Sequence, residues 1–134
     1  MQGRRWGAGV IAVTDGRVRR HTSLAAPIGG VTRTFIDLDG VLLVSALPVD
    51  EGLSLAFTLT TSTRSNVSLS AELEAPDGTR VFVPYPSVEL LGAGSRDIQL
   101  PPALFTLRAP GAYTFRLLLN NELKWSEGVE VALA

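Results

Sequence analysis

The sequence predicts an all-β domain built as an antiparallel β-sandwich, and three observations support this prediction. Short runs in which apolar and polar residues alternate, the pattern of half-buried strands, recur along the chain. Turn residues separate these runs at intervals of about 8–12 positions. The clearest run is Tyr113 to Leu119, which is followed by Asn120-Asn121-Glu122 and a second alternating run that ends at Leu133. This arrangement is typical of a β-hairpin that closes a sandwich.

The first half of the chain contains four predicted strands separated by turn signals. The apolar run 10–13 precedes Thr14-Asp15-Gly16, which we interpret as a turn, and residues 17–22 then resemble a polar edge strand. Asp39-Gly40 is typical of a hairpin turn between two further strands. Asp50-Glu51-Gly52 is predicted to be the next turn. The strands expected here are 10–13, 17–22, 31–38 and 41–47.

The second half continues the same pattern. Pro76-Asp77-Gly78 predicts a tight hairpin in which Leu73 and Val81 lie close to the turn. Pro84-Tyr85-Pro86 should end the returning strand, because proline donates no ladder hydrogen bond. A single helical turn near Pro101 to Phe105 fits the sequence. The strands expected here are 53–60, 67–73, 79–83, 88–91, 98–100, 113–119 and 123–133.

The composition indicates a single domain, residues 1–134, that is large enough to bury a core. Apolar residues make up 46% and the mean hydropathy is +0.24, so part of the surface is expected to be covered by another chain. The absence of cysteine excludes disulfides, thiol catalysis and cysteine-bound zinc. No apolar run is long enough for a membrane helix. Residues 1–13 are too glycine-rich for a signal peptide, which favours a cytoplasmic or virion-associated location over a secreted one.

Charge is distributed unevenly along the chain. Residues 1–36 carry about +5 and the remainder about −6, within a net charge of −1. The basic segment 1–24 is expected to be extended or an edge strand and to reach an anionic or protein partner. The favoured alternative is that its arginines line solvated faces and balance acids of the same fold. The predicted partner-binding residues are Arg4, Arg5, Trp6, Arg17, Arg19, Arg20 and Trp125. For Trp125, packing over the sandwich edge is the favoured alternative.

No set of residues predicts a catalytic centre, a cofactor site or a metal site. His21 is the only histidine, so a triad or an imidazole-based metal site lacks its other members. Asp37 and Asp39 would share one face of an extended segment and could hold Ca²⁺, but turn and solvent-facing roles explain them better. The glycine pairs are not followed by a helix signal or by the Lys-Ser/Thr of a phosphate loop. We therefore expect a protein that is not an enzyme.

Several motifs resemble those of immunoglobulin-like domains. Pro110-Gly111 places Tyr113 at the start of a strand, which resembles the tyrosine corner of such sandwiches. Together with Pro76-Asp77-Gly78, Phe115 and the stretch 129–131, it makes residues 53–133 similar to small prokaryotic immunoglobulin-like domains. The similarity is greatest to an uncharacterised bacterial family that ends in a Pro-Gly-x-Tyr-x-Phe strand, although Asn120-Asn121 replaces that family's usual Asp-Gly. The resemblance implies an immunoglobulin-like antiparallel β-sandwich and no activity.

These observations favour a non-enzymatic structural or protein-interaction module. We expect a subunit or accessory protein of a larger assembly, for example a virion decoration or tail component, that binds a protein partner or associates with itself. The alternative is a ligand- or carbohydrate-binding domain with Trp6, Tyr85 and Trp125 as stacking surfaces. A pI of about 5.8 disfavours nucleic acid as the main partner.

Overall fold

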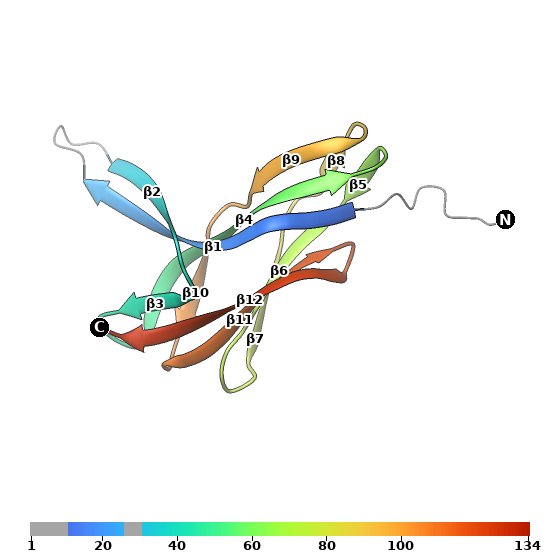
Figure 1. The fold of residues 1–134 in the computed structure, drawn as a ribbon. Coiled ribbons are helices and arrows are strands. Elements are labelled where there is room, and N and C mark those ends of the chain that lie inside the picture. The colour runs from blue at the N-terminus through green and yellow to red at the C-terminus, as the bar shows by residue number, and fades with distance from the viewer. Residues whose placement is uncertain (1–10, 26–30) are drawn as a thin grey trace.

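The protein is a β-sandwich in which two five-stranded sheets face each other. The computed structural model describes the backbone of residues 11–25 and 31–134 and the side chains of residues 11–21 and 35–134. In Figure 1, β1, β4 and β9 belong to the upper layer, and β11 and β12 to the lower one. The strands are β1 (Ile11–Ala25), β2 (Val31–Asp37), β3 (Val41–Val44), β4 (Val49–Thr61), β5 (Ser65–Val67), β6 (Leu69–Glu74), β7 (Arg80–Pro84), β8 (Val88–Leu90), β9 (Gly94–Gln99), β10 (Ala103–Leu107), β11 (Gly111–Leu119) and β12 (Glu122–Leu133).

The strand order is that of an immunoglobulin-like sandwich, which confirms the predicted fold class. The first sheet has the order β10-β4-β1-β2, with β9 also paired to β4, and the second has the order β3-β12-β11-β6-β7. The short strands β5 and β8 form a separate pair. Among the described strands, every pairing is antiparallel except that of β3 with β12, which is parallel. Within residues 11–25 and 31–134, no helix is long and apolar enough to cross a membrane.

The closing hairpin forms as the sequence predicts. Asn120 and Asn121 have φ values of 51° and 64°, as a two-residue type I′ turn requires. Along β11, from Tyr113 to Leu119, every second residue faces inward and is buried, and the residues between them are half-buried. Phe115 meets Phe105 of the opposite sheet edge to face, with ring centroids 5.6 Å apart. The hairpin therefore joins the two layers through the core.

The tyrosine corner is also present. The Tyr113 hydroxyl donates a hydrogen bond of 2.7 Å to the carbonyl oxygen of Ala109, four residues upstream, and the ring is buried. This bond fixes the loop between β10 and β11 against the start of β11. The Pro76-Asp77-Gly78 hairpin between β6 and β7 is confirmed as well, with Leu73 paired to Val81.

Three of the predicted turns, at Asp50-Glu51-Gly52, Asp39-Gly40 and Thr14-Asp15-Gly16, are wrong because long-range pairing overrides local turn signals. Asp50-Glu51-Gly52 lies inside β4, where Glu51 is paired with Phe105 of β10. The chain at Asp39-Gly40 closes no hairpin: β2 belongs to the first sheet, while β3 pairs with β12 in the second. Gly40 adopts a φ of 79° as the chain crosses between the layers. The segment near Pro101 to Phe105 is not helical either, since β10 begins at Ala103.

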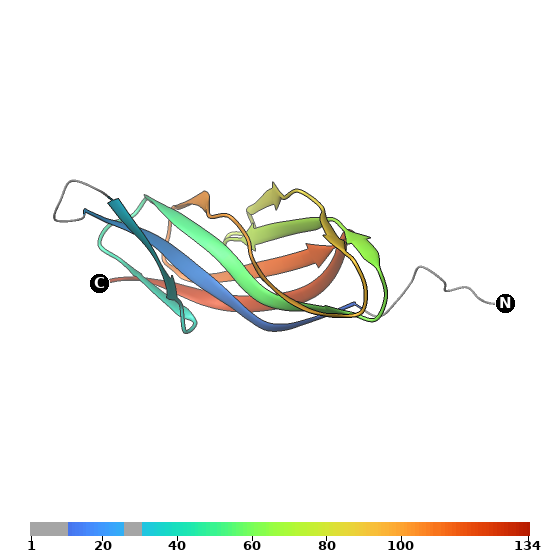
Figure 2. The same ribbon diagram turned by 90° about the horizontal axis from the view of Figure 1, so that it is seen from above.

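The N-terminal strand also differs from the prediction. Thr14-Asp15-Gly16 is not a turn but an irregularity within one long strand, because the register of β1 against β4 shifts between Thr14 and Arg17. Arg19 and Arg20 pair with both β4 and β2, so at these two positions the basic segment is extended but is not an edge, whereas residues 21–25 pair with β2. Figures 1 and 2 show the β1–β2 hairpin extending past the end of the sandwich.

Candidate functional site

The core of a β-sandwich can be exposed at the two sides where the edges of its sheets face each other. In this protein, one of these two sides is covered. On the side between β1 and β12, the Trp125 indole packs over Gly16 and against the hydrophobic core. The crossing segment lies on the same side: the Leu38 amide donates to the Val18 carbonyl of β1, and the Glu130 amide donates to the Gly40 carbonyl. Trp125 therefore packs over the sandwich edge, the alternative that the sequence favoured over an exposed contact role.

The β-bulge in β1 makes room for this tryptophan. Asp15 adopts a φ of 54°, and Asp15 and Gly16 have no register partner on β4. A Cβ atom on Gly16 would lie 2.4 Å from two indole atoms of Trp125, so only glycine fits beneath the ring.

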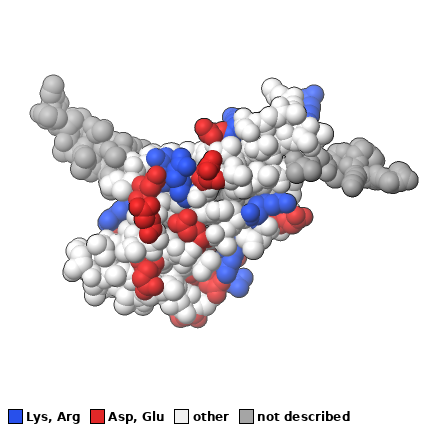
Figure 3. All heavy atoms as spheres, in the orientation of Figure 1, with Lys and Arg blue, Asp and Glu red and all other residues white. Residues whose placement is uncertain are grey.

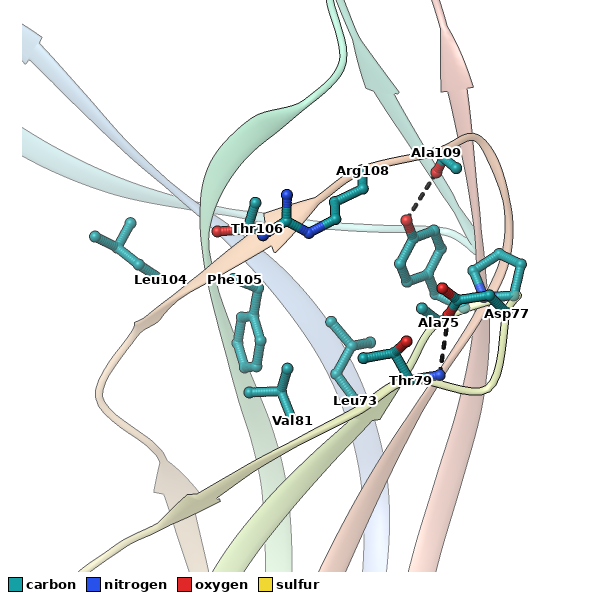
Figure 4. Close-up of a pocket in the computed structure, with 12 residues that line it drawn as sticks. Leu73, Ala75, Asp77, Thr79, Val81, Leu104, Phe105, Thr106, Arg108 and Ala109 are labelled. Atoms are coloured by element: carbon teal, nitrogen blue, oxygen red, sulfur yellow. Dashed lines mark hydrogen bonds between the residues drawn. The ribbon is translucent and has the colours of Figure 1, made fainter.

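The opposite side of the sandwich is open. There, β10 and the β10–β11 loop face the β6–β7 hairpin across a groove of about 440 Å³. Figure 4 shows Phe105 of β10 pointing toward Leu73 and Val81 of the β6–β7 hairpin. Phe105 and Leu73 belong to the buried core, whereas Leu104 is 77% exposed at the groove. The lining residues are Leu73, Ala75, Pro76, Asp77, Thr79, Val81, Leu104, Phe105, Thr106, Arg108, Ala109 and Tyr113.

The rim of this groove carries one acidic and one basic side chain. The Asp77 carboxylate accepts a hydrogen bond of 2.9 Å from the Thr79 amide, and this bond lowers the pKa of Asp77. Asp77 is thus charged at neutral pH and has its hydrogen-bonding partner within the β6–β7 turn. Arg108 is exposed and has no ion pair among the described residues. Its side chain lies along β10 toward Thr106 (Figure 4).

Two of the predicted partner-binding arginines lie on the outer face of the first sheet, where they pair with an acid of the same domain. Arg19 contacts Asp37 at 2.7 Å, hydrogen-bonds Gln99 and lies over the Phe35 ring at 5.6 Å. Arg17 lies 3.7 Å from the same carboxylate. Figure 3 shows acidic and basic side chains interspersed on one face of the molecule, without a broad basic area. This pairing supports the interpretation that these arginines balance acids within the fold.

Arg20 points to the other face of β1, into the end of the sandwich. Its guanidinium group makes two hydrogen bonds with Glu51, of 2.9 and 3.0 Å, and a third of 3.3 Å with the Leu43 carbonyl. Glu51 is only 8% exposed, so its charge requires this partner. A contact between Arg17, Arg19 or Arg20 and a partner protein stays a prediction. Arg4, Arg5 and Trp6 lie outside the described residues.

Tyr85 and Trp125, the two residues considered as stacking surfaces that the structure describes, are held within the fold. Burial raises the pKa of Tyr85, whose hydroxyl donates a 3.5 Å hydrogen bond to the Pro101 carbonyl. Trp125 lies over Gly16 as described. Among the other candidates, His21 packs against Phe35 with ring centroids 5.1 Å apart. Asp37 is paired with arginines, and residues 11–21 and 35–134 contain no cluster of three potential metal ligands.

Glu127 gives rise to a stability prediction. It shares the core side of β12 with Trp125 and Val129, where burial and the nearby charge of Asp39 raise its pKa. A raised pKa means that the folded state favours the protonated carboxyl over the charged one. The free energy of unfolding therefore falls as the pH rises through that pKa and the side chain ionises. Glu127→Gln should therefore raise the melting temperature at pH 7, and the difference should vanish below the ordinary glutamate pKa.

Thermal melting between pH 3.5 and 8 tests this expectation. Glu130→Gln, an exposed position on the same strand, is the matched control and should shift melting little at any pH. A Glu127→Gln protein that melts below the wild type at pH 7 would contradict the expectation.

The sequence contained no signal that singled out the groove. Leu104, Val81 and Arg108 are separated along the chain, and Pro101-Pro102 obscured the strand that carries Leu104.

Comparisons with known proteins find similarity to solved structures at low sequence identity. No protein-family model and no curated protein sequence matches the chain. One similar solved structure is the Pseudomonas fluorescens alkylpurine DNA glycosylase AlkC bound to DNA containing an abasic site analog, with a TM-score of 0.55 and 13% identity. The match covers 90% of this chain, which spans only 30% of that enzyme. Another is an immunoglobulin-like protein, PA1606, from Pseudomonas aeruginosa, with a TM-score of 0.38, 12% identity, and coverage of 92% and 97% of the two chains.

The fold and the groove together define the class of protein: an immunoglobulin-like β-sandwich module whose sheets are closed on one side and open on the other.

Proposed function

We propose that this chain is a non-enzymatic protein-interaction module, a subunit or accessory protein of a larger assembly, which binds its partner at the open side of the sandwich. The observation that supports this is the apolar groove between two edge strands, with Leu104 exposed beside it. Covering a leucine side chain contributes about 1.5–3 kcal/mol, and a partner would also shield the exposed edge of the first sheet. A virion decoration or tail component is one form of such an assembly.

Two other partner classes have less support. The glycosylase with the similar fold is bound to DNA in its structure, but here Arg19 and Arg20 are paired with acids and the chain is slightly acidic, whereas DNA binding needs unpaired cations. A glycan-binding surface needs exposed aromatic faces, and Trp125 and Tyr85 are both packed against the fold.

A pair of matched substitutions tests the proposal. Leu104 and Leu91 are 77% and 76% exposed, but Leu91 lies after β8, away from the groove. In extracts of the cells that produce the protein, the tagged wild type should elute above the 14.3 kDa of one chain. Leu104→Glu should elute as a single chain, because a charge would be buried at the contact. Leu91→Glu should elute like the wild type.

The free energy of unfolding of purified Leu104→Glu protein should lie within about 0.5 kcal/mol of the wild-type value, as is usual for a surface substitution. Loss of the complex would then reflect lost binding. Elution of the wild type at the mass of one chain would overturn the proposal. Equal loss in both variants would place the contact elsewhere and overturn the assignment to the groove.

A further inference from the structure

The two sides of the sandwich differ in what covers them. Trp125 and the Leu38–Gly40 crossing close the side between β1 and β12. On the groove side, Phe105, Leu73 and Tyr113 belong to the core yet line a cavity of about 440 Å³. The described part of the chain thus covers its core on one side and leaves an apolar groove on the other. Because the groove is bordered by two edge strands, an extended segment could lie along it.

The backbone of β10 is suited to receive that strand. Among the described strands, β10 pairs only with β4, and β7 pairs only with β6, so both border the groove as edges. Alternate N–H and C=O groups of an edge strand point away from its neighbour. β7 carries the edge-protecting features of a terminal proline, Pro84, and a charged residue, Arg80. β10, residues Ala103–Leu107, contains neither charge nor proline. A new strand is therefore expected to pair with β10.

The charged side chains at the rim of the groove indicate what charge the added strand would carry. Arg108 directly follows β10 and has no ion pair among the described residues. Asp77, on the opposite rim, already accepts a hydrogen bond from the Thr79 amide. A carboxylate on the incoming strand would complement Arg108. Because β10 runs toward Arg108, a strand added antiparallel to it would begin beside that arginine.

We propose that the groove binds an extended segment of a partner protein as an added antiparallel strand on β10. About five residues of the segment pair with β10, and alternate ones direct apolar side chains onto Phe105, Leu73 and Val81. An aspartate or glutamate at the N-terminal end of the segment faces Arg108. This inference rests on the proposed function and names the chemistry of the partner at the same site.

A peptide selection tests this recognition. A phage-displayed library of random 12-residue peptides is selected on the purified wild-type protein, with Leu104→Glu protein for counter-selection. Enriched peptides should carry apolar residues at every second position and an acidic residue N-terminal to them. Enrichment of helical spacing or proline-rich peptides, or no enrichment over the Leu104→Glu protein, would overturn the proposal. So would concentration-dependent dimerisation of the isolated protein through β10, which would make a second copy the occupant.

Binding of one enriched peptide, followed by fluorescence polarisation, separates the contributions. Arg108→Glu should weaken binding about three- to tenfold, and exchanging the acidic residue of the peptide for lysine should restore it. Arg96→Glu, an exposed arginine on β9 outside the groove, is the matched control and should leave binding unchanged.

N-methylation of the peptide amides that face β10 should abolish binding, whereas N-methylation of the intervening amides should not. Equal effects at both sets of amides would overturn strand addition. If the peptides fail while Leu104→Glu still disrupts the complex in extracts, the interaction function stands and only the nature of the partner segment is wrong.

Discussion

Replacing Gly16 by alanine is expected to destabilise the protein by about 1–3 kcal/mol, the usual range for overpacking a well-filled site. The added Cβ would lie 2.4 Å from two atoms of the Trp125 indole, which is far inside van der Waals contact. Either the tryptophan leaves its position or β1 moves away from β12. Both changes open the side of the sandwich that is otherwise closed. Chemical denaturation followed by tryptophan fluorescence would measure the loss, and in a Trp6→Phe background the signal comes from Trp125 alone and reports the movement of its ring.

Two comparisons make this expectation specific. Gly128→Ala is the matched control, because a Cβ atom there has no neighbour closer than 3.9 Å, and it should change stability by less than about 0.5 kcal/mol. In a Trp125→Leu background, the Gly16→Ala substitution should lose most of its effect, since the two positions are in contact. Additive losses in the double variant would show that the indole is not what excludes a side chain at Gly16.

Three Asp-Gly dipeptides show how far the sequence can predict this fold. Asp77-Gly78 forms the hairpin turn that its sequence indicates, with a φ of 90° at Gly78. Asp15-Gly16 also has a residue with positive φ, but as a bulge within β1. Asp39-Gly40 lies where the chain crosses between sheets. The dipeptide predicts a positive φ in each case. Pairing between strands that are distant in sequence determines whether that residue forms a hairpin turn, a bulge or a crossing between sheets.

The same limit applies to the candidate site. The closing hairpin and the Tyr113 corner could be predicted because their partners lie within a few residues. The groove could not, because Val81 and Leu104 come together only when the two sheets stack. No residue close to Asp15-Gly16 in the sequence predicts that this dipeptide lies beneath Trp125. Residues that are distant in sequence create both the closed side and the open one.

Separating Arg20 from Glu51 is expected to cost about 2 kcal/mol, somewhat less than the 3–5 kcal/mol of a fully buried pair because the arginine is partly exposed. Glu51→Leu would leave the guanidinium group without its two hydrogen bonds, and Arg20→Met would leave a carboxylate that is 8% exposed without a partner. The Arg20→Met/Glu51→Leu double variant removes both charges and should recover most of the stability. Urea denaturation of the three variants measures this recovery, and a double variant no more stable than the singles would contradict it.

This double variant also tests what Arg20 does in the protein. Its side chain bridges the layers, reaching Glu51 of β4 and the Leu43 carbonyl of β3, and that placement explains the arginine without a partner. If its role is structural, the folded double variant should enter the same complex in extracts as the wild type, while Leu104→Glu does not. If Arg20 instead contacts the partner, the double variant should be stable and yet elute as a single chain. The binding surface would then include the sheet end at β3 as well as the groove beside β10.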